Sequence, residues 1–121
     1  MLRPNSIVTT IDYKLVKDLA NIIFMLYDYS STIENADIAI GYMNKIAHRI
    51  IAFINHGLKF GHKEEKFVME IMNKHPEYWH IMKNATDKKP RLIYYIKKYS
   101  PFNWVRTYKF MLWVNNSFHN R

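Results

Sequence analysis

The sequence predicts an α+β fold, in which three main helices pack with a small mixed sheet. Apolar residues recur at three- and four-residue spacing over most of residues 15–82, which is typical of amphipathic helices. Two runs of β-branched and aromatic residues, 92–96 and 108–114, flank a turn at 100–103 and predict a C-terminal hairpin. The hydroxyl-rich segment 29–33 predicts a short additional strand, with a tight link between two helices as the alternative.

The first helix is expected to begin at Asp12, whose carboxylate can cap its N-terminus, and to end near Asp28. The second helix should run from about residue 36 to residue 55, capped by Thr32 or Asn35.

Two glycines bear on the second helix. Gly57 is placed to end it. Gly41 lies within its apolar pattern, at a cost of about 1 kcal/mol relative to alanine, and we interpret it as a site of close packing.

A loop over 56–63 should lead to a third helix at 64–74. Pro76 interrupts this helix, and residues 77–83 are expected to add another turn or two before a lysine-rich loop at 84–90. We see no internal repeat or linker, so residues 1–121 are predicted to form a single domain with short flexible ends.

The composition is basic, with 18 Lys and Arg against 10 Asp and Glu, giving a formal net charge of +8. Polyanions are therefore the expected partners, because each cation that meets a phosphate releases counterions. A basic helix lying on a membrane surface is the alternative. The most basic stretch, 88–109, is interrupted by Pro90 and Pro101, and this favours nucleic acid.

Several classes of function are disfavoured by residue content. Without cysteine, disulfides, thiolate nucleophiles and cysteine zinc sites are excluded. The six histidines lack zinc-ligand spacing, three glycines are too few for a phosphate-binding loop, and the adjacent Glu64 and Glu65 point in different directions on a helix. We expect no enzyme, metal, cofactor or small-molecule substrate. Neither a membrane span nor an apolar signal core is visible, so no membrane partner is expected.

Basic residues interleaved with aromatic residues from 88 to 109 form the predicted contact surface for RNA. Tyr95, Tyr99 and Trp104 could stack on unpaired bases. The alternative is an ordinary solvated strand face whose aromatic residues serve the core.

Several short motifs follow one another in a particular order. They are the hydroxyl pair Ser31-Thr32, Ala36, Lys45-Ile46, Phe67-Val68-x-x-Ile71-Met72, Pro76-x-Tyr78 and the two basic C-terminal runs. In this order and spacing the chain resembles, over nearly its whole length, the L-seventeen family of large ribosomal subunit proteins of bacteria and organelles. It departs from the family in a basic N-terminal tail reduced to Arg3, in a helix missing or collapsed into 56–63, and in the entry to the first terminal strand at 90–94.

The resemblance implies a structural constituent of the large ribosomal subunit, with rRNA and neighbouring ribosomal proteins as partners. The departures favour a mitochondrial ribosome, with a bacterial or other organellar ribosome as the alternative. Two other functions stay open, namely a small basic structural protein of a large DNA virus and a regulatory nucleic-acid-binding protein. The predicted RNA-binding residues are Lys14, Lys17, Thr32, Lys45, Arg49, Lys59, Lys63, Lys88, Lys89, Arg91, Lys97, Lys98, Arg106 and Lys109.

Overall fold

The computed structural model describes residues 4–119, with side chains for 13–59 and 61–115, and over this range helices joined by short turns and loops are present and no strand forms. The predicted α+β class is therefore wrong, and the predicted flexible ends fall largely outside the described residues. The helices, in chain order, are α1 (Pro4–Ser30), α2 (Ala36–Phe60), α3 (His62–Lys74), α4 (Pro76–Lys83), α5 (Lys88–Tyr99) and α6 (Trp104–His119).

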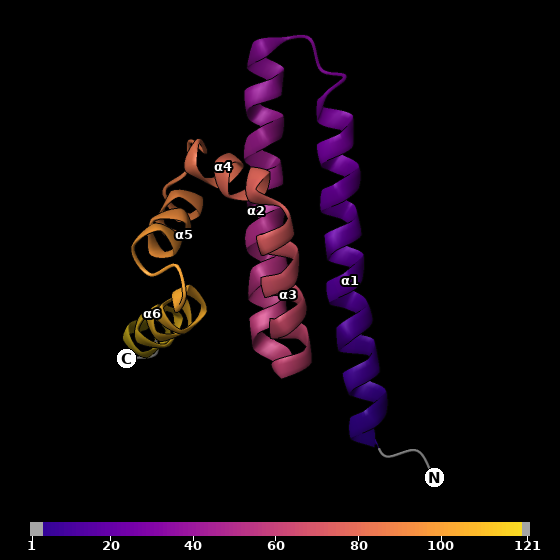
Figure 1. Ribbon diagram of the computed structural model, residues 1–121, viewed down its shortest axis with the longest axis vertical. Coiled ribbons are helices and arrows are strands. Elements are labelled where there is room, and N and C mark those ends of the chain that lie inside the picture. The colour runs from indigo at the N-terminus through magenta and orange to yellow at the C-terminus, as the bar shows by residue number, and fades with distance from the viewer. Residues whose placement is uncertain (1–3, 120–121) are drawn as a thin grey trace.

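The two long helices α1 and α2 form an antiparallel hairpin, and α3 packs against both of them (Figure 1). Helix α4 crosses α2 and directs the chain toward α5 and α6, which lie on the side of α2 away from α1 (Figure 1). Helix α2 thus lies between α1 on one side and α5 and α6 on the other (Figure 1).

The segment 29–33 is a helix end and a turn, and no strand forms there. The hydroxyls of Ser30, Ser31 and Thr32 donate to the carbonyl oxygens of residues 27, 28 and 29, each three positions earlier. These bonds satisfy carbonyl groups that the end of α1 leaves without helical partners, so the hydroxyl-rich sequence closes a helix instead of building a strand.

Of the two predicted caps for α2, Asn35 is the one used. Its Oδ1 accepts hydrogen bonds from the backbone N–H groups of Asp37 and Ile38 at 3.0 and 3.1 Å. The first helix begins at Pro4, well before the predicted cap at Asp12, and proline is tolerated there because first-turn N–H groups lack helical acceptors.

The roles predicted for Gly41 and Gly57 are both wrong. Helix α2 continues through Gly57 to Phe60, so Gly57 does not end it. A Cβ added at Gly57 would lie 2.0 Å from Cγ2 of Val68, whereas a Cβ at Gly41 would meet no atom within 4 Å. Gly57 is therefore the close-packing glycine, where α3 crosses α2.

The two C-terminal runs are helices because each also satisfies helical periodicity. In α5, Pro90, Ile93 and Ile96 are buried at three-residue spacing, and Pro90 lies in the first turn, where no helical hydrogen bond is lost. In α6, Trp104 and Tyr108 lie one turn apart in the core. Strand propensity depends on context, and here burial at helical spacing prevails.

The core is centred on the C-terminal half of α2, where Ile46, Ile50, Phe53 and Ile54 are fully buried. The predicted third helix and the short segment after Pro76 are confirmed as α3 and α4. Tyr78 and Trp79 of α4 are buried, and Trp79 packs edge-on against the Trp104 ring of α6 at 5.0 Å between centroids.

The glycine assignment predicts opposite effects for two matched substitutions. Gly41→Ala should raise the free energy of unfolding by about 0.5–1 kcal/mol, because alanine has the higher helix propensity and its methyl group meets open space. Gly57→Ala should lower it by about 1–3 kcal/mol, because the methyl group collides with Val68. Urea unfolding followed by circular dichroism measures both, and destabilisation by Gly41→Ala would mean that Gly41 is the packed site.

Candidate nucleic-acid interface

The net positive charge of the chain is confined to its C-terminal part. The first 87 residues contain ten basic and ten acidic side chains, and residues 88–121 contain eight basic side chains and no acidic one. The whole formal net charge of +8 therefore resides in residues 88–121, and seven of these eight cations belong to α5 and α6. Such an asymmetry between two parts of a chain indicates a polyanionic partner for the charged part.

One face of α5 is exposed and carries basic and aromatic residues in alternation. Since Ile93 and Ile96 point into the core, the opposite side of the helix faces solvent. Apart from Lys89 in the first turn, the exposed side chains recur at helical spacing along α5 and are Lys88, Arg91, Leu92, Tyr95, Lys98 and Tyr99.

The two exposed tyrosines of α5 form one platform with a lysine. The rings of Tyr95 and Tyr99 are stacked at 6.4 Å between centroids with an interplanar angle of 21°. Lys98 Nζ lies 6.0 Å from the Tyr95 ring and 5.7 Å from the Tyr99 ring. A cation and two aromatic faces are thus available at one place on the surface.

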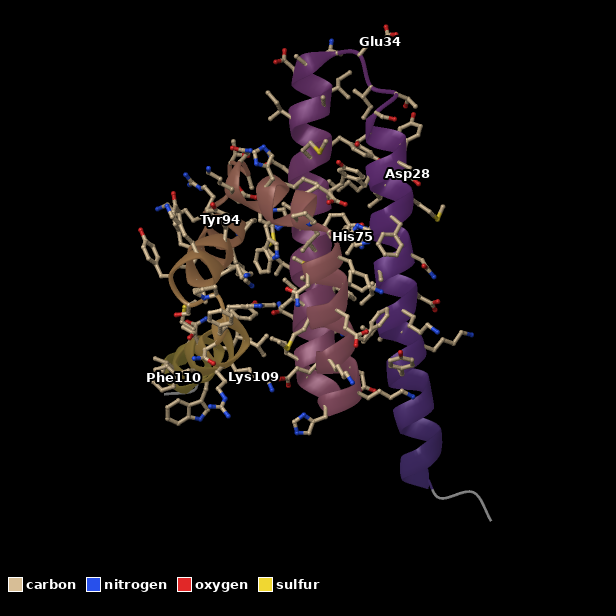
Figure 2. The ribbon with its side chains drawn as sticks, viewed as in Figure 1. Asp28, Glu34, His75, Tyr94, Lys109 and Phe110 are labelled. Carbon is tan, nitrogen blue, oxygen red and sulfur yellow. The ribbon has the colours of Figure 1, made fainter. Side chains whose placement is uncertain are left out.

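Exposed aromatic residues continue onto the turn and α6. Phe102 in the turn is 93% exposed, and Phe110 and Trp113 of α6 are each 64% exposed. Figure 2 shows Phe110 on the side of α6 that points away from α2. Together with the exposed α5 face, these residues and Arg106 make up what we call the α5–α6 surface.

A groove of about 830 Å³ lies between α5 and α6 and opens onto this surface. Lys88, Lys89 and Arg91 line it on the α5 side, at the start of the helix. Ile93, Tyr95, Tyr108, Met111 and Leu112 are among the residues that make its wall largely apolar.

The start of α5 is fixed to α2 by the loop that precedes it. The backbone N–H of Thr86 donates to Oδ1 of Asn44 at 2.9 Å, and the His48 ring pairs with the Asp87 carboxylate. Arg91 adds bonds from its guanidinium to the carbonyl oxygens of Asp87 and Thr86, at 3.3 and 3.4 Å.

Helix α6 is held by contacts with α2 and α3. The Tyr108 hydroxyl donates to Oδ1 of Asn55, and the Lys109 ammonium pairs with the Glu65 carboxylate. Figure 2 shows Lys109 on the side of α6 that faces α3. Burial raises the pKa of the Tyr108 hydroxyl to about 12, although the Asn55 bond lowers it in part, so the side chain stays a neutral donor.

The structure brings together the seven basic residues predicted between 88 and 109, but with unequal availability. Lys88, Lys89, Lys98 and Arg106 are exposed. Arg91 is bonded to the preceding loop, Lys97 is half-buried with Nζ 5.9 Å from the Trp79 ring, and Lys109 is paired with Glu65.

The prediction that Trp104 stacks on unpaired bases is wrong. Trp104 is only 2% exposed and packs on Trp79, so it belongs to the core, while Tyr95 and Tyr99 lie at the surface as a stacking role requires. The sequence placed Trp104 between the predicted turn at 100–103 and the predicted strand at 108–114, whereas in the structure it begins α6, one helical turn before the buried Tyr108.

The other predicted contact residues come from α1, α2, the start of α3 and the α1–α2 turn, all within the part of the chain that carries no net charge. Lys17 and Lys63 lie over the Tyr13 ring at 5.4 and 4.1 Å, which joins α1 to α3. Thr32 donates to a carbonyl at the end of α1. The remaining four are exposed and scattered over the helices, and are Lys14, Lys45, Arg49 and Lys59.

Sequence reasoning missed the exposed aliphatic and aromatic residues of the α5–α6 surface, Leu92, Phe102, Phe110 and Trp113. Two signals could have found them. One is the helical periodicity of 88–99, which places Leu92 opposite the core face, and the other is the absence of acidic residues after Asp87.

A histidine–carboxylate pair lies where α3 meets α4. His75 Nδ1 and Glu77 Oε1 are 2.8 Å apart, and the His75 ring stacks on Tyr78 at 4.8 Å. Burial tends to raise the pKa of the Glu77 carboxyl, but its own backbone N–H and the hydrogen bond and charge of His75 together lower it. Within the part of the chain that the structure describes, no three His, Asp or Glu residues converge on a possible metal position.

Among the helices of residues 4–119, none combines the length and the apolar character needed to cross a bilayer. Comparison with family models, curated proteins and solved structures finds no match to this chain. A functional proposal therefore rests on the α5–α6 surface itself.

The anchoring of α5 predicts a local effect for a substitution far from it in sequence. Asn44→Ala should cost about 1 kcal/mol of stability, because the Thr86 amide loses its acceptor, and should speed amide exchange mainly in 84–92. Hydrogen–deuterium exchange with mass spectrometry measures this, with Asn73→Ala on the exposed side of α3 as the matched control. Equal protection of 84–92 in both variants would contradict the anchoring role.

Proposed function

We propose that this chain binds single-stranded RNA through the α5–α6 surface. The observation that carries the proposal is the exposed face of α5, on which lysine and arginine alternate with stacked tyrosines in a segment that has eight cations and no acidic residue. Cations attract the phosphate backbone, and aromatic faces receive the bases.

The exposed rings favour unpaired over duplex RNA. Bases in an A-form duplex are already stacked, and its major groove is too narrow for side chains to enter. Tyr95, Tyr99, Phe110 and Trp113 instead offer flat surfaces on which unpaired bases can stack, each worth about 1–3 kcal/mol. The cations at the groove entrance, Lys88 and Lys89 among them, are placed to hold adjacent phosphates.

This proposal is coarser than the ribosomal prediction. The resemblance requires two closing strands over 92–114, and in that range the structure has α5, a turn and α6, so this part of the resemblance fails. A role in the large ribosomal subunit, a mitochondrial location, and the viral and regulatory alternatives all stay predictions, and each is compatible with RNA binding.

Binding to an anionic membrane surface is the second candidate, because α5 and α6 are helices and Pro90 and Pro101 no longer argue against it. An interfacial helix separates a charged face from an apolar face. On α5, Lys98 lies between Tyr95 and Tyr99 on the same exposed face. Because cations and aromatic rings share one face, this surface suits single-stranded RNA, which offers phosphates and bases together, better than a lipid surface.

Substitutions on α5 should separate stacking from charge. Tyr95→Ala combined with Tyr99→Ala should weaken binding of a fluorescent 15-nucleotide single-stranded RNA at least about tenfold, because stacking is lost, while the Tyr→Phe pair should bind like the parent chain. Lys98→Gln should reduce the slope of log K against log salt by about 1. Fluorescence anisotropy at several salt concentrations measures all three.

Lys74→Gln, at an exposed site on α3 in the uncharged part of the chain, is the control for Lys98→Gln and should leave the slope unchanged. Binding that is equally strong in the Tyr→Ala pair would remove stacking from the proposal. Sedimentation with anionic phospholipid vesicles, together with no measurable RNA binding, would assign the surface to membranes instead.

A further inference from the structure

Helix α1 carries an exposed apolar stripe that does not belong to the core. Met25 is 71% exposed, Tyr29 60%, and Leu15 and Ile22 40% each. We call these four residues the α1 stripe. The core face of the same helix is formed by neighbouring positions such as Val16, Ala20 and Ile23, which are buried.

The spacing of the α1 stripe is that of a helix that packs on another helix. Leu15, Ile22 and Tyr29 are seven residues apart, and Met25 lies three residues after Ile22, which matches the a and d positions of a heptad. The remaining d position within the stripe is held by Asp18. Tyr29 also contacts Tyr42 of α2, at 5.7 Å between ring centroids, whereas Leu15, Ile22 and Met25 lie outside the core cluster.

We propose that a second copy of this chain packs on the α1 stripe, with the two α1 helices antiparallel about a two-fold axis near Asn21. The inference stands on α1 alone and does not depend on the proposed RNA binding.

The charges that flank the α1 stripe support both the partner and the orientation. Lys14, Asn21 and Asp28 lie on the same flank of the helix, seven residues apart, and all three are exposed. Figure 2 shows Asp28 on the outer side of α1. An antiparallel two-fold axis at Asn21 brings Lys14 next to the partner's Asp28, and does so twice. In a parallel arrangement these flanks would lie on opposite sides of the interface, facing the partner's Leu19 and Leu26, and no such ion pair could form.

The same register decides which apolar residues meet. Leu15 lies opposite the partner's Met25, and Asp18 lies opposite the partner's Ile22. A polar residue at a single core position weakens helix pairing but restricts the register, so Asp18 limits the affinity of this interface.

Long-range electrostatics permit this contact. The first 87 residues carry no net charge, and Figure 1 shows α1 at the edge of the molecule away from α5 and α6. Two copies can therefore associate along α1 without bringing their cationic segments together. The contact is isologous, so it closes after two copies.

Because the chain has no cysteine, single-cysteine variants report directly on the orientation. With a short bis-maleimide reagent, Asn21→Cys should cross-link to itself. Lys14→Cys alone should not, but it should cross-link when mixed with Asp28→Cys. Lys74→Cys, on the exposed side of α3, gives the background of random collisions. Self-linking of Lys14→Cys as efficient as that of Asn21→Cys would overturn the antiparallel arrangement.

Charge reversal tests the pairing at equilibrium by analytical ultracentrifugation of the full chain. Lys14→Glu and Asp28→Lys should each weaken dimerisation about tenfold, because two ion pairs become repulsive, and the double variant should restore it. Asp18→Leu should strengthen dimerisation and Met25→Glu should abolish it, whereas Asn73→Ala, at an exposed site on α3, should leave dimerisation unchanged.

Circular dichroism of each variant tests whether the monomer is folded. We expect every variant to fold, because every substituted position is exposed. A parent chain that stays monomeric at several hundred micromolar would overturn the proposal. A dimer whose stability the double charge reversal fails to restore would also overturn it, since its interface would then lie elsewhere.

Discussion

The structure depends on α2 burying a wide face along its C-terminal half. Ile46, Ile50, Phe53 and Ile54 are fully buried, and α1, α3, α4 and α5 all contact this helix. A helix can serve several neighbours at once only if they approach closely, and at Gly57 the missing side chain leaves room for Val68 of α3. This approach sets the position of α3, and through α4 it sets the position of everything that follows.

The same packing explains why the chain can keep two different surfaces apart. Helix α1 covers one side of α2, and α4 and α5 cover another, so the exposed faces of α1 and α5 belong to elements separated by the core. The distribution of charge follows this division, with a neutral part up to Asp87 and a strongly basic part after it. A protein whose basic residues were spread evenly over its surface would lack this separation.

The sequence predicted four helical segments correctly and failed wherever local composition and periodicity pointed to different structures. Helices α1 to α4 have long apolar periodicity or a proline boundary, and Asn35 was identified as a possible cap. In 92–96, β-branched and aromatic residues outweighed a helical pattern that only Ile93 and Ile96 anchor. The contact with Val68 that makes Gly57, and not Gly41, the close-packing glycine joins two different helices, and no local sequence pattern encodes it.

The candidate site lies in the segment that composition indicated, and the helical structure changes which of its side chains share a face. Lysines and tyrosines between 88 and 109 were identified from composition, which does not depend on secondary structure. A strand would have divided Tyr95, Lys98 and Tyr99 between two faces, whereas the helix places all three on one. The helix therefore gathers residues that the predicted fold would have separated, and buried residues of both helices, among them Ile93, Ile96, Trp104 and Tyr108, hold α5 and α6 to the core.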